Sequence, residues 1–406
     1  MDPVEILLNQ DKIIPYYRPI ISADTQLVTG YEVSAFFQEQ DGTIQNLDWF
    51  FKDPSIPEEY LLEIINHVIH SSLNYYLNNK ISANLLFKYE AKILYKDRGE
   101  NLIELLQSYS ERNLNLNKIV IQIKDEFSYD ELESIEKVFQ YMKSFGIKIA
   151  IDDTGEQNGN LERLALLKPN IIKVDAGFLN DEDLPHLFPD VHHSLSLFAR
   201  KIGASLMFKG INTYNQLNYA WRNGGQFYQG NFLHRPEPHF VDINCCKAKL
   251  EKHFQLFINH ERKKVKAQLQ LTKNIHRLFK SILQTVDIDQ NYDDLILHIG
   301  KKCSDFAFRV YVCNDMGIQV SADAIKLKDG TWELVQNERM KNWSWRPFFF
   351  ENIARMNLEK KGILSDLYTD IERYELIRTY SYPISDDLFI FLDIPYDYLF
   401  EQEGLL

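Results

Sequence analysis

The chain has 406 residues, 45% of them hydrophobic and 25% charged, which is enough for two folded domains of ordinary size. Its formal net charge of -13 argues against a general binder of nucleic-acid polymers or of membranes, while a local basic pocket stays open. No apolar run reaches membrane-spanning length, no signal peptide pattern opens the chain, and the four cysteines lack zinc-type spacing. We therefore expect a cytoplasmic protein.

Strands and helices alternate between residues 118 and 233. Apolar runs predict strands at 118–123, 147–152, 170–175, 204–210 and 226–233, and amphipathic runs predict helices at 129–146, 160–168, 192–203 and 214–224. Repeated strand–helix units with short connections imply a parallel sheet with right-handed crossovers. Because strands this apolar need cover on both faces, the pattern predicts an α/β fold, a TIM-type (β/α)8 barrel over residues 1–240.

The pattern changes after residue 238. Residues 242–286 contain neither Pro nor Gly and have apolar positions at helical spacing, which predicts a linker over 241–288 of one long helix or two stacked helices. We interpret the basic run at 260–268 as a solvated helix face. Residues 289–406 predict an α+β domain, with two strands around a turn at 315–317 and an antiparallel pair at 376–384 and 387–394.

Polar residues follow several of the predicted barrel strands. Asp152 and Asp153 end the strand at 147–152, and they either start a turn or belong to a metal site at the barrel mouth. One Asp pair cannot hold a divalent cation alone, so a metal site requires further carboxylate or amide groups at other strand ends. The candidates are Glu32, Asn84, Lys173, Asp175 and Gln229.

Eight short segments, in this order, resemble the EAL family of cyclic di-GMP phosphodiesterases, and the resemblance covers residues 13–236. They are PYYRPI (15–20), GYEVSA (30–35), ISANLL (81–86), IVIQIKD (119–125), IAIDDTG (149–155), IIKVD (171–175), MFKGI (207–211) and FYQGNFL (227–233). The basic linker and the aromatic C-terminal half are most similar to the YkuI type, an EAL domain with its own C-terminal sensor-like domain.

The resemblance implies a barrel mouth that holds two divalent cations, which activate a water to open one phosphodiester bond of cyclic di-GMP and give linear pGpG. It assigns catalytic roles to Glu32, Asp152, Asp153 and Lys173. It assigns metal binding to Glu32, Asn84, Asp152 and, weakened, Gln122, and ligand binding to Arg18, Lys209 and Gln229.

Several family positions have changed in this chain. Gln122, Lys209 and Asn212 stand where the family has Glu or another acid, which moves the pocket by about four charge units toward positive. Phe36 stands where the family has a ligand-binding Arg, and the loop at 155–160 is altered. We therefore expect magnesium or manganese at one position at most, and none as the alternative.

These departures leave three functional hypotheses. The leading one is a degenerate EAL-domain protein of cyclic di-GMP signalling, a catalytically impaired receptor or regulatory module. The first alternative is a weak, metal-dependent phosphodiesterase that produces pGpG, and the second is a protein-interaction scaffold that binds no nucleotide. We also expect a homodimer and a protein partner that the sequence does not identify.

The C-terminal half resembles Cache-type sensor domains of the PAS-like superfamily, through residues 342–353 and 362–384. The resemblance implies a ligand pocket lined by Arg346, Tyr368 and Asp370. The alternative is a structural and dimerising domain whose aromatic residues fill its core.

Overall fold

The computed structural model describes residues 3–39, 41–124, 127–153, 161–180, 188–286, 291–336, 339–346 and 349–403. The chain divides into two compact units, Met1–Gln255 and Leu256–Leu406. In the described ranges, no helix combines the length and the apolar character that a membrane span requires.

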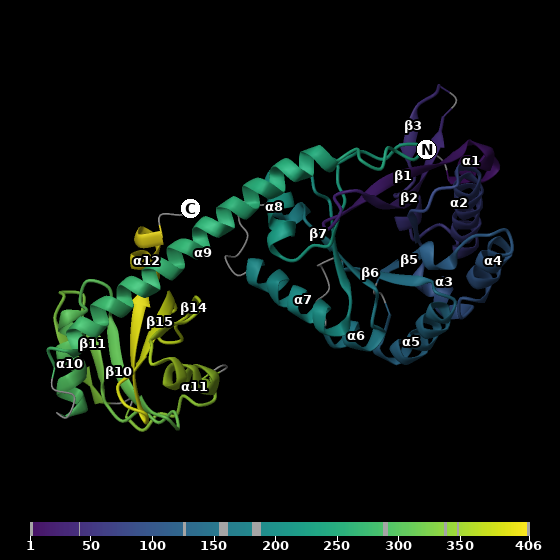
Figure 1. Ribbon diagram of the computed structural model, residues 1–406. Helices are drawn as coiled ribbons and strands as arrows, with labels where there is room; N and C mark the ends of the chain where they lie inside the picture. Colours follow the sequence, from purple (N-terminus) through teal and green to yellow (C-terminus); the bar gives the residue numbers. More distant parts are fainter. Residues whose placement is uncertain are drawn as a thin grey trace. The chain divides into compact units, whose positions relative to one another are not determined.

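The first unit is a closed eight-stranded barrel surrounded by helices (Figure 1). Around the barrel the order is β1-β9-β8-β7-β6-β5-β4-β2, and β1 closes it by pairing with β2. The short strand β3 (Ile44–Asn46) pairs with β2 outside this ring. The barrel strands are β1 (Ile13–Ser22), β2 (Val28–Gln38), β4 (Asn84–Lys88), β5 (Ile119–Lys124), β6 (Lys148–Asp153), β7 (Ile171–Asp175), β8 (Ser205–Lys209) and β9 (Phe227–Tyr228).

The predicted α/β barrel is confirmed, with one difference. β1 is antiparallel to both of its neighbours, β2 and β9, whereas the pairs from β2 round to β9 are parallel. Residues 23–27 form the whole connection between β1 and β2, and a connection this short joins antiparallel strands, because a parallel pair needs a crossover of a dozen or more residues.

Helices cover the outside of the barrel, and their limits follow from capping residues. α5 (Tyr129–Ser144) begins at a capping box of Ser128 and Glu131, and it ends two residues before Gly146, whose φ of 87° suits glycine. α8 (Tyr214–Arg222) begins at a second capping box. The other helices of this unit are α1 (Pro3–Leu8), α2 (Glu58–Asn79), α3 (Ala91–Lys96), α4 (Glu100–Ser110), α6 (Leu161–Leu167) and α7 (Phe188–Ile202).

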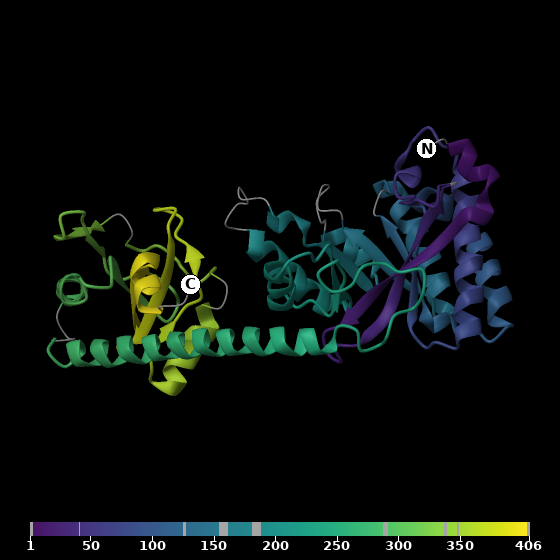
Figure 2. The ribbon, with the colours of Figure 1, turned by 90° about the horizontal axis from the view of Figure 1, so that it is seen from above.

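The linker is one helix and not two. α9 runs without interruption from Lys247 to Leu283, as Figure 2 shows, and the division between the two units falls within it. Its first turns pack on the barrel through Leu250 and Phe254, and its later turns contribute Ile275 and Phe279 to the core of the second unit. The absence of Gly and Pro over 242–286 is consistent with a continuous helix.

The second unit is built on an antiparallel sheet of seven strands in the order β12-β11-β10-β16-β15-β13, with β14 paired to β15. One core cluster includes residues of α9 and α10, and another includes residues of α11. The elements are α10 (Tyr292–Lys302), β10 (Arg309–Asn314), β11 (Asp323–Lys326), β12 (Trp332–Val335), α11 (Phe349–Glu359), β13 (Ile363–Leu364), β14 (Tyr368–Thr369), β15 (Leu376–Pro383), β16 (Leu388–Pro395) and α12 (Tyr396–Glu403).

The two predicted strand pairs of this unit fare differently. The pair at 376–384 and 387–394 is confirmed as β15 and β16. The pair around 315–317 is wrong in part, because after the turn at Gly317 the chain makes only isolated bridges at Ile318 and Gln319, and the next strand begins at Asp323.

Candidate functional site

A layer of polar side chains lies at the C-terminal ends of the parallel barrel strands. The layer below it is apolar and includes Ile20, Leu86, Val120, Ala150 and Met207. Because side chains alternate between the two faces of a strand, a residue two positions further along points to the same interior. Those positions hold Lys88, Gln122, Asp152 and Lys209, and on β1, which runs in the opposite direction, the equivalent position two residues before Ile20 holds Arg18. The same side of β2, β7 and the end of β9 adds Glu32, Lys173 and Gln229.

Glu32 has a partner on each of its carboxylate oxygens. Nζ of Lys173 lies 3.1 Å from Oε1, Nζ of Lys88 lies 3.9 Å from the same oxygen, and Nε2 of Gln229 donates to Oε2. Burial alone would raise the pKa of Glu32, but attraction to Lys173 and Lys88 and the hydrogen bonds from Lys173 and Gln229 outweigh it and lower the pKa to about 2. Glu32 is therefore ionised and already engaged by the protein.

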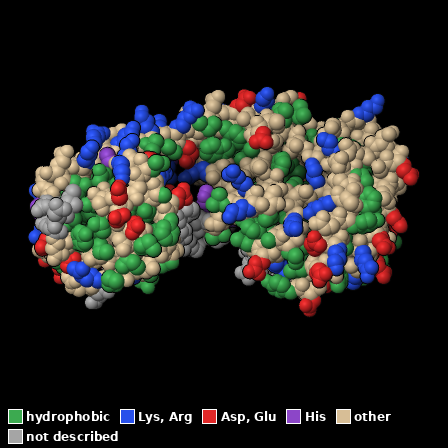
Figure 3. Space-filling view, turned by 60° about the horizontal axis from the view of Figure 1, so that its bottom comes forward, with side chains coloured by type: hydrophobic (Ala, Val, Ile, Leu, Met, Phe, Trp, Pro, Cys, Tyr) green, Lys and Arg blue, Asp and Glu red, His purple; other side chains and the backbone are tan. Residues whose placement is uncertain are grey.

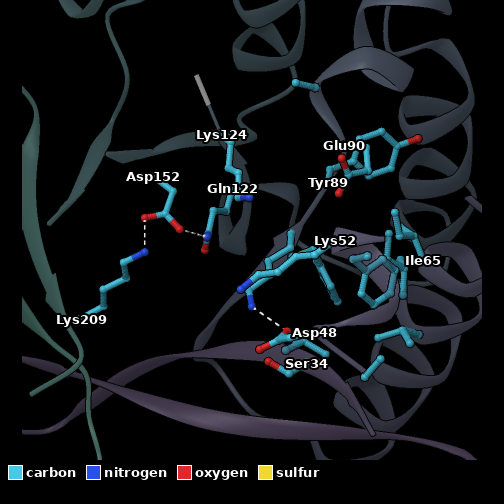
Figure 4. A pocket seen from close by; sticks show the side chains of 18 of the residues that line it. Ser34, Asp48, Lys52, Ile65, Tyr89, Glu90, Gln122, Lys124, Asp152 and Lys209 are labelled. Atoms are coloured by element: carbon cyan, nitrogen blue, oxygen red, sulfur yellow. Dashed lines mark hydrogen bonds and ion pairs between the residues drawn. The ribbon is translucent and has the colours of Figure 1, made fainter. Parts of the chain in front are cut away.

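Asp152 is held between Gln122 and Lys209 (Figure 4). Nε2 of Gln122 donates to Oδ2 over 2.8 Å, and Nζ of Lys209 lies 2.6 Å from Oδ1. The other end of the Gln122 amide accepts a hydrogen bond from Nζ of Lys173, at 2.6 Å. Gln122 thus connects the two carboxylates into one network, Lys209–Asp152–Gln122–Lys173–Glu32.

Lys173 is fully buried at the centre of this network. Burial lowers its pKa, attraction to Glu32 and Asp152 opposes that shift, and repulsion from Lys88 and Lys209 adds to it. The net result is a lowered pKa of Lys173, and the attraction to the two carboxylates is what limits the fall.

Some predicted residues take no described part in this network. Asn84 was expected to end a strand, but β4 begins there, and its amide donates to the backbone oxygen of Thr29 over 3.2 Å, on the far side of the apolar layer. Arg18 donates to Oδ1 of Asn231 over 3.1 Å. The side chain of Asp153 lies outside the described part of the chain.

Lys88 is the site residue that the sequence reasoning missed. It lies 3.9 Å from Glu32 and 3.2 Å from Oδ1 of Asp48, and it pairs in register with Gln122. Burial would lower its pKa, but Glu32 and Asp48 together raise it. The signal that was available is the alternation through Leu86 and Lys88, which places both side chains on the same face of one strand.

A cavity of about 590 Å³ opens beside the network. The polar side chains that line it include Lys88, Gln122, Lys124, Asp152 and Lys209, whereas Phe51, Ile65, Val68, Ile69 and Phe87 make another part of its wall apolar (Figure 4). The cavity wall thus has charged groups of both signs on one part, with Asp48, Glu90 and Asp175 among the carboxylates, and apolar groups on another.

The described residues at the barrel mouth do not fit a pair of divalent cations. In the described ranges, no group of three or more His, Cys, Asp or Glu side chains lies close enough to hold a metal ion. A hard cation prefers several oxygen ligands, and here Glu32 and Asp152 are each paired with ammonium groups, while Gln122 offers an amide.

The predicted C-terminal pocket residues lie near one another but are differently engaged. The guanidinium carbon of Arg346 lies 4.0 Å from the ring centre of Trp343 and 5.9 Å from that of Tyr368. The Tyr368 hydroxyl is hydrogen-bonded to Thr379 over 2.6 Å. The carboxylate of Asp370 forms an ion pair with Arg309 and accepts a hydrogen bond from the backbone amide of Arg373.

Arg309 is the centre of this second cluster and was not predicted. Its Nε donates to Asp393 over 2.7 Å and its Nη1 to Glu372 over 2.8 Å, besides the ion pair with Asp370. Arg309 and Asp393 face each other in the register of β10 and β16. A single Arg and a single Asp, each the only charged residue in its strand, are the signal that was available.

Comparison with known proteins agrees with this barrel. Residues 3–236 match the EAL domain, and residues 240–406 match the EAL-domain associated signalling protein domain, YkuI_C. The chain therefore belongs to the EAL-domain family. Within it the chain has the YkuI arrangement. It is 39% identical, over 100% of both chains, to the uncharacterized EAL-domain containing protein YkuI of Bacillus subtilis (strain 168).

Solved structures extend the comparison. The crystal structure of Bacillus subtilis YkuI in complex with substrate c-di-GMP and calcium matches with a TM-score of 0.93 at 38% identity, covering 98% of this chain and 100% of that one. The FimX EAL domain of Pseudomonas aeruginosa bound to c-di-GMP matches with a TM-score of 0.51 at 19% identity, over 60% of this chain and 100% of that one. At that identity the second match supports the fold alone.

Proposed function

We propose that the chain binds c-di-GMP at the barrel mouth with its own cations and cleaves it slowly or not at all. The observation that carries this proposal is the ion pair between Lys209 and Asp152, 2.6 Å apart, which places an ammonium group beside a carboxylate that the family uses for metal binding. Lys209 in this role is a tethered cation. It supplies positive charge to a phosphate without activating a water.

The cavity wall offers ammonium groups to an anionic ligand, although its formal charges are balanced. Lys52, Lys88, Lys124 and Lys209 line the cavity together with the carboxylates Asp48, Glu90, Asp152 and Asp175, and the buried pair of Lys173 and Glu32 adds one charge of each sign. A cyclic dinucleotide has two phosphodiester anions and two flat bases, which the ammonium groups in one part of the cavity wall and the apolar groups in another part can contact. The c-di-GMP bound in the YkuI crystal structure supports the same ligand class for this chain.

A weak metal-dependent phosphodiesterase is the second candidate. It is favoured by the YkuI structure, which holds calcium together with c-di-GMP at 38% identity to this chain. A metal at Glu32 and Asp152 would have to compete with Lys173 and Lys209 for their oxygens.

A scaffold without nucleotide binding is the third candidate. It is favoured by Phe36, which replaces the ligand-binding Arg of the family and whose ring stacks on that of Tyr16 with centroids 4.2 Å apart. The homodimer, the protein partner and a ligand at Arg346 stay predictions.

Calorimetric titration of c-di-GMP into the full chain separates these candidates. The titration is run in EDTA and then with excess Mg²⁺ or Mn²⁺, and each mixture is chromatographed for pGpG. The proposal expects binding in EDTA and little or no pGpG in either buffer. Binding that requires the metal and is followed by formation of pGpG would establish the metal-dependent phosphodiesterase. The absence of binding heat in either buffer would favour the scaffold that binds no nucleotide.

Matched variants assign the binding to Lys209. Lys209→Met removes the ammonium and keeps much of the side chain, so binding in EDTA should weaken by about tenfold or more. Lys137→Met is the control, because Lys137 lies on the outer surface of α5 in an exposed pair with Glu133 and should leave binding unchanged.

A further inference from the structure

Helix α9 is strongly cationic in an acidic protein. It contains ten Lys or Arg residues and two Glu residues, so it contributes +8 to a chain of net charge -13, and the other residues together carry -21. From Arg262 to Val286 the sequence has no Asp or Glu. A solvated helix face usually mixes both signs, which gives favourable pairs three and four residues apart.

The charges of the later part of the helix fall on one narrow stripe. Arg262, Lys266, Lys273, Arg277 and Lys280 follow one another at intervals of four, seven, four and three residues, which places them on the same side of an α-helix. All five are exposed. At 1.5 Å per residue the stripe is about 27 Å long. We name these five residues the cationic stripe.

The stripe is not neutralised within the described ranges. None of its five side chains forms an ion pair with a carboxylate there, and Arg277 donates to Oδ1 of Asn274 instead. Arg262 and Lys266, and again Lys273 and Arg277, are like charges four residues apart, an arrangement that destabilises an isolated helix. A row of such charges is expected where something anionic covers it.

An apolar strip runs beside the cationic stripe. Ile258, Val265 and Leu269 are 38%, 53% and 59% exposed and are spaced seven and four residues apart. Apolar residues at this spacing, flanked by charges of one sign, are what one helix of a coiled coil presents to its partner. Figure 3 shows Lys and Arg side chains following one another along an edge of the C-terminal unit.

From these observations we infer that this face of α9 binds an acidic amphipathic helix of another protein. The partner helix places apolar residues on Val265 and Leu269 and carboxylates along the cationic stripe. The same face of a second copy of this chain is not a suitable partner, because its cations would lie against the cations of the first copy. A single acidic helix can contact the cationic stripe alone, whereas the larger surface of an anionic membrane or a nucleic acid would also meet and repel the remaining residues of the chain, which carry -21.

The test uses the full chain and a defined probe. The probe is a fluorescently labelled 21-residue helical peptide with Leu at the a and d positions and Glu at the flanking e and g positions, and a peptide with Lys in place of Glu is its control. Fluorescence anisotropy should show saturable binding of the Glu peptide that weakens as salt is added, and no binding of the Lys peptide.

Variants locate the binding on the helix. Lys266→Glu combined with Lys273→Glu should weaken binding of the Glu peptide by about tenfold or more, and Leu269→Ser should weaken it with the charges intact. Lys328→Glu, an exposed charge change on the loop before β12, should leave binding unchanged. Circular dichroism shows whether each variant keeps its helix content.

Two further binding experiments compare the acidic helix with the other anionic partners, a membrane and a nucleic acid. Phosphatidylglycerol vesicles and a single-stranded oligonucleotide replace the peptide under the same conditions. Binding of either one with no binding of the Glu peptide would overturn the inference, and so would equal binding of the Glu peptide to the double variant.

Discussion

Lys209, the last residue of β8, reaches past β7 to Asp152 on β6 and places its ammonium nitrogen 2.6 Å from Oδ1. The same strand end brings Lys209 within 4.0 Å of Asp175 on β7. The carboxylate that would otherwise be available at the barrel mouth is thereby occupied by a group that the chain itself provides.

The ion pair between Lys209 and Asp152 predicts that substitutions can create a metal-binding site here. Lys209→Glu combined with Gln122→Glu replaces a cation and an amide by two carboxylates, so Mn²⁺ should raise the melting temperature of the double variant far more than that of the native chain. Differential scanning fluorimetry with Mn²⁺ and with EDTA measures this. Lys209→Met is the control, since it removes the cation and adds no ligand. An equal Mn²⁺ response in the native chain would contradict the prediction.

We predict a large loss of stability when Lys173 is replaced by an uncharged residue. Lys173→Met leaves Glu32 buried without its main counter-ion, and breaking a buried pair in this way typically costs about 3–5 kcal/mol. Urea unfolding measures the loss. Lys88→Met is the matched control, because the Lys88 side chain is 45% exposed and lies 3.9 Å from Glu32, so its loss should be well under half as large. Similar losses in the two variants would show that burial of Lys173 is not what matters.

The lowered pKa of Glu32 predicts that this residue makes the stability of the chain depend on pH. Its pKa is lowered from 4.5 to about 2 in the folded chain, so its contribution is complete above about pH 4.5 and is lost as the pH falls toward 2. A shift of this size corresponds to roughly 3 kcal/mol. Because other carboxylates titrate in both proteins, the difference in unfolding free energy between the native chain and Glu32→Gln isolates this residue. That difference should shrink as the pH is lowered from 5 to 3, and a constant difference would be evidence against the depressed pKa.

We predict that the stability of the C-terminal unit depends on the guanidinium group of Arg309. Arg309→Met leaves Asp393, which is fully buried, and Asp370 without their shared cation, and should cost about 3–5 kcal/mol. Arg309→Lys keeps the charge but loses the planar fork that contacts several carboxylates at once, so it should be intermediate. Glu372→Gln changes a half-exposed partner and serves as the control for chemical denaturation. A loss in Glu372→Gln as large as that in Arg309→Met would refute the central role of Arg309.

The sequence predicted the barrel well, because its strands are β-branched runs separated by capped helices, and the eight ordered segments then placed most of the polar layer. It failed at Asn84 and Lys88. Both lie on the same strand face, and only the register of β4 with β5, Lys88 opposite Gln122, decides which of them reaches the mouth. Register depends on pairing with a strand distant in the chain, which no local pattern specifies.

Prediction in the second unit was limited for a related reason. Asp370 was placed in a ligand pocket because of its neighbours in the sequence, but its ion pair is with Arg309, 61 positions earlier. The long helix α9 was predictable because helical periodicity is local, whereas the choice between one helix and two depended only on the absence of a breaking residue.

The closure of the barrel by β1 also sets when the site can exist during synthesis. Glu32 and Gln229, which hydrogen-bond to each other, are 197 positions apart in the chain, and β1 and β9 meet through only a few residues near Ile21 and Tyr228. Contacts this distant form late, because the intervening chain must first be ordered. A nascent chain that has not yet exposed residue 229 has most of the cavity wall but an open seam beside Glu32. Nucleotide binding by ribosome-bound chains of increasing length would therefore appear abruptly, and would mark the moment at which the ring of strands closes.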